Sequence, residues 1–337
     1  MINIRYKLIN PKQIIEEFVD EKVLDGDVVV RPKYLSICKA DQRYYQGTRD
    51  KQILNKKLPL SLIHEGIGEV IYSKCSSYKI GDNVVMLPNV LENKGAFKEN
   101  YDTHSKFCGS SCDGFMRQNV ICKDSNLLKL PSDDVSLVFL ELMSVAFNAV
   151  CEFDKINKHR MESIAIYGDG SLSFITSLIM KKVYKHSKII VIGKHKEKLS
   201  FFTFADEVYT LDKLPDELNF DHAFECVGGR GSESAINQII EKINPQGIVS
   251  LLGVSENSIG INTRMVLEKG LYLIGNSRSS KEDFEKALKF IIDYPDSINY
   301  LKNIISDVVE VNSIKDMDLS FMLDTTNQFK TIMKWNV

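Results

Sequence analysis

The sequence lacks a strong excess of either charge, and it lacks a long apolar run. Its 43 lysines and arginines nearly balance its 45 aspartates and glutamates, which leaves a net charge of −2 at pH 7. Proteins that bind nucleic acid or anionic membranes carry a basic excess, so neither partner is expected. No stretch approaches about 18 uninterrupted apolar residues, and no apolar run follows Arg5 and Lys7, so we predict neither a membrane-spanning helix nor a signal peptide.

A disulfide framework is also lacking, because the seven cysteines are odd in number and scattered. This usage predicts reduced thiols in a cytoplasmic protein. The rest of the composition is ordinary, with 44% hydrophobic and 26% charged residues over 337 positions. Such a chain is long enough for about two globular domains.

One stretch has the pattern of a nucleotide cradle. Residues 163–167 predict a strand, 168–171 a glycine-bearing turn, 172–183 an amphipathic helix and 188–192 a second strand. Glycines let the backbone approach a pyrophosphate, and the helix N-terminus offers N–H donors. Ser173 stands at the third glycine of the G-x-G-x-x-G pattern. The candidate cofactor-binding residues here are Gly168, Gly170, Ser171 and Leu172.

Strands and helices alternate after the cradle. The further strand candidates are 208–211, 222–226, 248–252 and 272–274, and residues 232–243 predict an amphipathic helix. This alternation is typical of an α/β fold with a parallel sheet and right-handed crossovers.

The tip of the second cradle strand indicates which dinucleotide binds. An acid there bonds the ribose 2′-hydroxyl of NAD, whereas a 2′-phosphate requires cations. The chain has Gly193, Lys194, His195 and Lys196 at this point, with Lys198 close by and no acid until Glu197. This pattern favours NADPH over NADH, although lysines are also common where a solvated helix begins.

The first part of the chain consists of short predicted strands separated by turns. The candidates are 28–30, 33–37, 66–72 and 83–87, punctuated by glycine and proline, which indicates an all-β body. Residues 91–112 are polar and aperiodic and predict a long surface loop.

Two clusters in this β body contain possible metal ligands: Cys38 with Asp41, and His64 with Glu65. A thiolate, an imidazole and a carboxylate are the ligand types of a catalytic zinc site. Taken alone, Cys38 could be a small buried hydrophobic residue, and His64 and Glu65 could be a pair of surface residues.

The order of these motifs resembles the medium-chain dehydrogenase/reductase family. The matching motifs are Cys38-x-x-Asp41, then His64-Glu65-x-x-Gly68-x-Val70, then Gly168-x-Gly170. The resemblance covers nearly the whole chain. It implies a GroES-like β-rich catalytic domain over 1–143, completed by 278–337, and a Rossmann domain with a six-stranded parallel sheet over 144–277. It also implies hydride transfer from NADPH to a ketone.

The resemblance assigns roles to individual residues. Cys38 and His64 would be zinc ligands, Glu65 a ligand that exchanges with substrate or water, and Glu141 the fourth ligand position. An exposed glutamate at a helix start is the alternative for Glu141. Asp41 would brace His64 from outside the ligand set.

Two departures from the family pattern change the expected chemistry. The loop that carries a structural zinc in many members offers only Cys108 here, and Cys112 looks like the start of the next strand, so we predict one catalytic zinc and no structural zinc. The hydroxyl that relays protons falls at Ala40, which has none. Proton delivery would then involve zinc-bound water with Glu65, or Tyr44.

The resemblance also implies a substrate. It indicates reduction of D-ribulose 5-phosphate to D-ribitol 5-phosphate, which supplies CDP-ribitol for wall teichoic acid or capsule synthesis. A substrate phosphate requires a cationic clamp, for which arginine fits best. The candidate clamp residues are Arg43, Arg49 and Arg278, the last two equally consistent with ordinary surface arginines. Family positions for cofactor contacts are Leu252 and Gly253 at the nicotinamide, and Lys39 and Lys330 at the pyrophosphate.

Other functions remain open on the sequence. They are a zinc polyol dehydrogenase acting on an unphosphorylated sugar alcohol, a zinc-free reductase of quinone type, and a non-catalytic subunit that binds a cytidylyltransferase. A homodimer through the edge strand of the cofactor domain is the family expectation.

Overall fold

The computed structural model describes residues 1–91, 95, 97–158 and 160–337, which form two compact units. Unit 1 contains Met1–Glu141 and Ser280–Val337, and unit 2 contains Leu142–Ser279. The chain passes between them within helix α3 (Leu140–Ile156), and it returns to unit 1 just before helix α8 (Lys281–Asp293).

Unit 1 is built on a seven-stranded sheet. Its strands run in the order β16 (Ile305–Val311), β17 (Lys330–Trp335), β3 (Asp27–Ser36), β4 (Glu65–Ser73), β5 (Asn83–Met86) and β9 (Leu127–Lys129), with β8 (Val120–Lys123) paired to β3. Two small sheets pair β1 (Ile2–Asn10) with β2 (Gln13–Asp20), and β6 (Asn89–Val90) with β7 (Lys106–Phe107). The helices of unit 1 are α1 (Lys39–Tyr45), α2 (Lys51–Lys57), α8, α9 (Ser297–Lys302) and α10 (Ile314–Thr326), with 3₁₀ turns at Asp124–Asn126 and Val135–Phe139.

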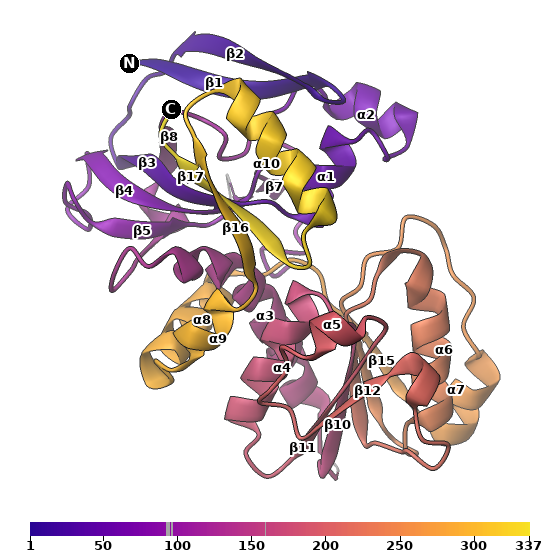
Figure 1. The fold of residues 1–337 in the computed structure, drawn as a ribbon. Coiled ribbons are helices and arrows are strands. Elements are labelled where there is room, and N and C mark those ends of the chain that lie inside the picture. Colours follow the sequence, from indigo (N-terminus) through magenta and orange to yellow (C-terminus); the bar gives the residue numbers. More distant parts are fainter. Residues whose placement is uncertain (92–94, 96, 159) are drawn as a thin grey trace. The chain divides into compact units, whose positions relative to one another are not determined.

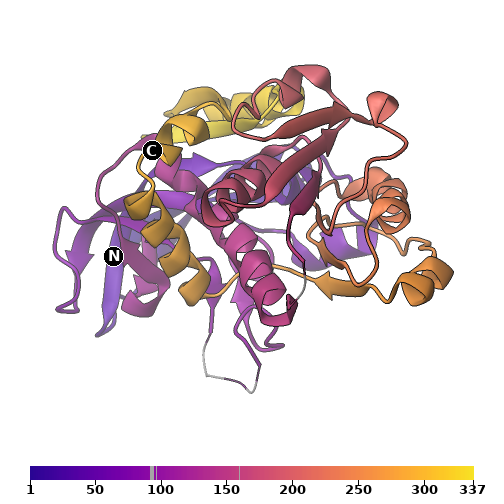
Figure 2. The same cartoon turned by 90° about the horizontal axis from the view of Figure 1, so that it is seen from below.

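The C-terminal segment completes this sheet. Strand β17 pairs antiparallel with β3 through Ile332 opposite Ser36, and α10 packs beside β16 and β17 (Figures 1 and 2). Both chain termini therefore belong to unit 1.

Three predictions for this unit are corrected. The predicted strands 28–30 and 33–37 form one strand, β3, which ends at Ser36 and accommodates Pro32 by a shift in register between Pro32 and Tyr34. The expected loop over 91–112 contains β7, and Cys112 does not begin a strand but forms an isolated bridge with Cys108. Residues 92–94 and 96 of that loop lie outside the described part of the chain.

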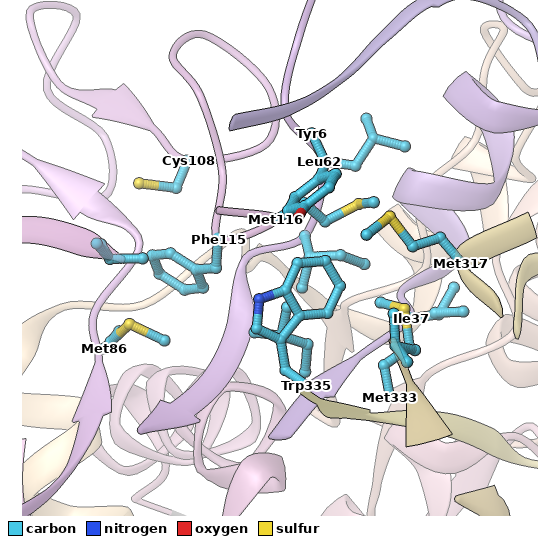
Figure 3. Packing of buried hydrophobic residues seen from close by; sticks show 14 of the residues in the cluster. Tyr6, Ile37, Leu62, Met86, Cys108, Phe115, Met116, Met317, Met333 and Trp335 are labelled. Carbon is cyan, nitrogen blue, oxygen red and sulfur yellow. The ribbon is translucent and has the colours of Figure 1, made fainter. Parts of the chain in front are cut away.

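The core of unit 1 joins residues from both ends of the chain. The Trp335 ring meets the Tyr6 ring edge-on at 5.5 Å between centroids, and its indole N–H donates to the Arg117 carbonyl at 2.8 Å. Figure 3 shows this pair beside Met116 and Met333. A tryptophan N–H satisfied in this way allows the ring to be buried.

Unit 2 has the predicted α/β fold. A six-stranded parallel sheet runs in the order β12 (Glu207–Thr210), β11 (Lys188–Gly193), β10 (Ser163–Tyr167), β13 (His222–Glu225), β14 (Ile248–Leu251) and β15 (Tyr272–Gly275). Its helices are α3, α4 (Ser171–Val183), α5 (Lys196–Leu199), α6 (Ser232–Lys242) and α7 (Thr263–Lys269), with 3₁₀ turns at Leu211–Lys213 and Gly229–Gly231. The strand order reverses at β10, which places the ligand crevice at the carboxyl ends of β10 and β13.

One helical stretch, Val135–Ile156, is long and apolar enough to cross a membrane by length and composition alone. Of its most apolar window, 72% is buried within the protein. A core helix has the same character, so this stretch is weak evidence for a membrane span.

Candidate active site

Three metal-ligand side chains meet in unit 1. Cys38 directly precedes α1, and His64 and Glu65 lie where β4 begins. The Cys38 thiol, an imidazole nitrogen of His64 and a carboxylate oxygen of Glu65 all lie within 4.8 Å of one another. Among the residues that the structure describes, this is the one group of three or more such side chains close enough to share a metal ion.

Asp41 fixes the two backbone segments that carry these ligands. Its Oδ2 accepts a hydrogen bond from the Cys38 N–H, and its Oδ1 accepts one from the Ile63 N–H, both at 3.0 Å. The distance from Oδ1 to His64 Nδ1 is 3.7 Å, which is too long for a hydrogen bond. Burial raises the pKa of Asp41. The carboxylate therefore holds the main chain on both sides of the site.

The residue before His64 has an unusual backbone conformation. Ile63 has φ of 70°, a region that β-branched residues rarely occupy. Its N–H is held by Asp41, and its carbonyl accepts from the Phe115 N–H at 2.7 Å. A side chain at Gly114 would collide with the carbonyls of Leu62 and Ile63. Such conformations persist only where neighbours enforce them, and they cluster at functional sites.

Lys330 lies directly against Glu65. Its ammonium is 2.6 Å from Glu65 Oε1 and donates to the Ile37 carbonyl at 2.8 Å. Burial lowers the pKa of Lys330, but the Glu65 carboxylate and the Cys38 thiol outweigh this, so the pKa is raised overall. The other oxygen, Glu65 Oε2, has no hydrogen-bond partner although it is buried. Lys330 thus holds one carboxylate oxygen and leaves the second available to a ligand.

The surroundings of His64 favour the protonated, positively charged form of its imidazole. Burial lowers its pKa, yet Asp41, Cys38 and Glu141 raise it well above the ordinary value. Burial also raises the pKa of Glu141 to about 7. Glu141 lies outside the group of three ligands but close enough to interact electrostatically with His64 and Glu65.

These features fit a divalent cation. The donor set contains sulfur, nitrogen and oxygen, and acidic groups surround it. Buried Glu65 Oε2 lacks a hydrogen-bond partner, and a metal ion would supply one. Zinc takes this mixture of ligands in catalytic sites, with a further position open to substrate or water.

The predicted phosphate-clamp arginines occupy different environments. Arg43 lies in the last turn of α1, and the Arg49 guanidinium stacks over the ring of buried Tyr44 at 4.3 Å from its centroid. Arg278 belongs to unit 2, has φ of 57°, and has a pKa lowered by burial. Lys39 at the start of α1 pairs with Asp324 Oδ2 at 3.3 Å.

The nucleotide cradle of unit 2 follows the carboxyl end of β10. Gly168 has φ of 132°, and a Cβ there would crowd the Cys226 carbonyl at 3.1 Å and the Ser173 Cβ at 3.3 Å. Gly170 directly precedes α4, and a Cβ there would meet no atom within 4 Å. Ser173 fits in place of the third glycine, because its hydroxyl donates to the Gly170 carbonyl at 2.8 Å. The helix N-terminus, with Ser171 and Leu172, therefore faces open space that suits a phosphate.

An acid that the sequence pattern did not reveal shapes the tip of β11. Asp169 Oδ2 accepts from the N–H groups of Lys194 and His195, both at 2.7 Å. A Cβ at Gly193 would collide with the Asp169 side chain. The Asp169 carboxylate is therefore already bonded to backbone N–H groups at the tip of β11. The Lys194 side chain is exposed at this tip, and the Lys198 side chain is half-buried.

Glu225 is a second residue missed from the sequence. Its Oε1 accepts from the N–H groups of Val227 and Gly228, and its Oε2 accepts from that of Gly253, all at 3.0 Å. A Cβ at Gly253 would collide with this carboxylate. One buried side chain thus ties the loops after β13 and β14, which include Leu252 and Gly253, at the crevice edge of the sheet. A carboxylate at the end of a buried strand was the only sequence signal.

Comparison with known proteins gives a consistent result. Residues 24–132 match the alcohol dehydrogenase GroES-like domain, and residues 182–293 match the zinc-binding dehydrogenase family. The chain is 43% identical to a ribulose-5-phosphate reductase of Bacillus spizizenii, covering 100% of both proteins. It is 44% identical to ribulose-5-phosphate reductase 1 of Staphylococcus aureus, covering 99% of both.

A solved structure agrees with these relatives. The crystal structure of S. aureus TarJ in complex with NADPH superposes with a TM-score of 0.89 at 41% identity, covering 100% of both chains. These matches confirm the fold and the resemblance that the motifs indicated. The chain belongs to the zinc-binding dehydrogenase family of medium-chain dehydrogenases and reductases, in which its full-length relatives include ribulose-5-phosphate reductases.

Proposed function

We propose that this chain reduces D-ribulose 5-phosphate to D-ribitol 5-phosphate with NADPH in the cytoplasm. The product would supply CDP-ribitol for wall teichoic acid or capsule synthesis. The supporting observation is the buried Cys38, His64 and Glu65 group in a chain that is 43% identical over its full length to a ribulose-5-phosphate reductase.

One zinc ion would be held by Cys38, His64 and Glu65, with Glu141 as the candidate fourth ligand. Zinc supplies a Lewis acid for the ketone oxygen, and the nicotinamide supplies the hydride. Asp41 holds the backbone segments that carry Cys38 and His64 in place, and Lys330 restrains Glu65 through one carboxylate oxygen. Ala40 offers no hydroxyl, so Glu65 acting through water, or the Tyr44 hydroxyl, would deliver the proton to the product oxygen.

The lysines at the tip of β11 would select NADPH, and Lys194→Asp tests this. The change removes a cation from the 2′-phosphate and places an acid beside it. A charge-assisted hydrogen bond is worth about 1.5–3 kcal/mol, so the KM for NADPH should rise roughly 10–100-fold, with little change for NADH. Steady-state kinetics with both cofactors measures the difference. Lys185→Asp, in the exposed turn that precedes β11, makes the same charge change as a control. Equal effects of Lys194→Asp on the two cofactors would refute the assignment.

Arg43 is our first candidate for the substrate phosphate, because α1 carries it within about one and a half turns of Cys38. Arg43→Ala should raise the KM for D-ribulose 5-phosphate roughly tenfold or more, since arginine–phosphate contacts are charge-assisted. The KM for NADPH should not change. Exposed Arg31 in β3 provides a matched alanine control. A normal KM for the sugar phosphate would exclude Arg43 and leave Arg49 and Arg278 to be tested.

Two protein partners belong to this proposal. The first is a second copy of the chain, joined through β15, which is an edge strand of the six-stranded sheet. The second is a cytidylyltransferase that would take up the ribitol phosphate. Light scattering of the purified protein distinguishes a dimer from a monomer, and a substitution that introduces a charge at exposed Tyr272 of β15, such as Tyr272→Glu, should shift it toward monomer.

The substrate assignment is tested by comparing D-ribulose 5-phosphate with D-ribulose under the same conditions. The proposal predicts a kcat/KM for the phosphorylated ketose at least about 100-fold higher, as expected for about 3 kcal/mol of charge-assisted phosphate contacts. Equal values for the two ketoses would favour a polyol dehydrogenase instead.

A further inference from the structure

A pair of cysteines lies in a tight turn of unit 1, outside the metal-ligand group. Cys108 follows β7 directly, and Cys112 forms an isolated bridge with it. The Gly109 N–H donates to the Cys112 carbonyl at 2.9 Å, and the Ser110 and Ser111 N–H groups donate to the Phe107 carbonyl at 3.1 and 2.9 Å. These bonds fold the turn back on itself and place the two cysteine backbones side by side.

The spacing of such a bridge suits a disulfide. Paired backbones lie about 4.8 Å apart, and disulfides join Cα atoms about 4.4–6.8 Å apart. Both cysteines are reduced in this structure.

The two thiols differ in the way that thiol–disulfide exchange requires. The neighbouring Cys108 thiol lowers the pKa of Cys112, and the Arg117 guanidinium adds to this effect against burial, which raises it. The neighbouring Cys112 thiol and burial raise the pKa of Cys108. Cys112 is partly exposed, whereas Cys108 is buried at the margin of the core cluster shown in Figure 3. A more acidic, accessible thiol attacks first, and its neighbour resolves the product.

The turn is packed against the segment that carries His64. The Phe107 ring lies 5.1 Å from the His64 ring, centroid to centroid. A Cβ at Gly109 would approach the Ile63 nitrogen at 3.2 Å, which shows how closely the two backbones pack. A change in the turn therefore acts on residues in direct contact with a proposed zinc ligand.

We propose that Cys108 and Cys112 form a thiol–disulfide site that reacts with a low-molecular-weight disulfide and lowers activity when oxidised. The Cys112 thiolate attacks one sulfur of the small disulfide, which forms a mixed disulfide and releases one small thiolate. The Cys108 thiol then loses its proton and attacks the Cys112 sulfur, which closes the internal disulfide and releases the second small thiolate. The protein loses two hydrogens, and one small disulfide is reduced to two thiols.

Treatment of the full-length enzyme with oxidised glutathione, followed by peptide mapping, tests the site directly. We expect a Cys108–Cys112 disulfide that dithiothreitol reverses. The Cys108→Ala variant should retain glutathione as a stable mixed disulfide on Cys112, and Cys112→Ala should retain none at this turn. Cys75→Ala, at another partly buried thiol of unit 1, should still form the disulfide. Absence of the disulfide, or glutathione found only on other cysteines, would overturn the proposal.

The effect on activity rests on the proposed function, whereas the mapped disulfide does not, so the two failures can be told apart. We expect oxidation to lower NADPH-dependent reductase activity at least several-fold, with recovery on reduction. The Cys108→Ala/Cys112→Ala double variant should be resistant to glutathione disulfide. Equal inactivation of the double variant would place the sensitivity at another thiol, such as Cys38, and would overturn the regulatory role.

Discussion

Replacing Cys38 with alanine is expected to remove bound zinc and to lower kcat by roughly 10²–10³-fold or more. Electrostatic stabilisation of a developing oxyanion by one preorganised group is worth about 2.7–4 kcal/mol, and an ion that supplies a full charge contributes at least as much. The thiol is one of three ligand groups that lie within 4.8 Å of one another, so its loss leaves this group with one imidazole and one carboxylate. Metal analysis and single-turnover reduction measure the two effects.

The matched control is Cys75→Ala, at a thiol that is partly buried in the same unit but lies outside the ligand group. It should retain zinc and activity. A Cys38→Ala enzyme with normal turnover would show that the reduction does not depend on this site. Loss of zinc from the Cys75→Ala protein would point instead to general misfolding of unit 1.

Replacing Lys330 with methionine is expected to destabilise unit 1 by about 3–5 kcal/mol, because removing one partner of a buried ion pair leaves the other charge uncompensated. Lys330 and Glu65 are both buried, and their charged atoms are 2.6 Å apart. For a domain of about 150–250 residues, each kcal/mol shifts Tm by about 2–4 °C, so a fall of roughly 10 °C is expected. Thermal unfolding of zinc-free and zinc-loaded protein measures it. Zinc should reduce the difference, because the ion would compensate the Glu65 charge.

A double change separates the charge effect from a packing effect. Lys330→Met combined with Glu65→Gln removes both charges and should recover most of the lost stability, since a neutral buried pair avoids the uncompensated carboxylate. Lys330→Arg keeps the charge and should be milder than Lys330→Met. If Lys330→Met and the double variant unfold at the same temperature, the ion pair contributes little and the side-chain packing of Lys330 dominates.

Helices and strands with a clear local pattern could be predicted from the sequence. The strand Ser163–Tyr167 has the predicted bounds, and helix α4 (Ser171–Val183) begins one residue before the predicted start, because strand and helix patterns of this kind are read within a few residues. Cys38, His64 and Glu65 were identified by motif order, and the fold brings them together. Strand β3 was divided at Pro32 because a proline is a reliable strand breaker except where a bulge accommodates it.

Contacts between residues far apart in the chain could not be predicted from the sequence. Lys330 and Glu65 are separated by 265 positions in the sequence, and no local pattern predicts that they form an ion pair. Asp169 and Glu225 bind backbone N–H groups of segments that become neighbours only when the parallel sheet forms. The Cys108–Cys112 bridge was missed because its turn is made by backbone hydrogen bonds within a polar, aperiodic stretch. Residues of this kind hold the ligand-bearing segments in place, and their roles appear only in three dimensions.

The most direct test of the account is NADPH oxidation with D-ribulose 5-phosphate, measured on enzyme before chelation, after chelation and after zinc is restored. We expect that chelation abolishes the activity and that added zinc restores it, with about one zinc per chain in the active protein. Activity that survives complete removal of the metal would contradict a zinc-assisted reduction at Cys38, His64 and Glu65. Absence of activity in protein that holds its zinc would contradict the substrate assignment.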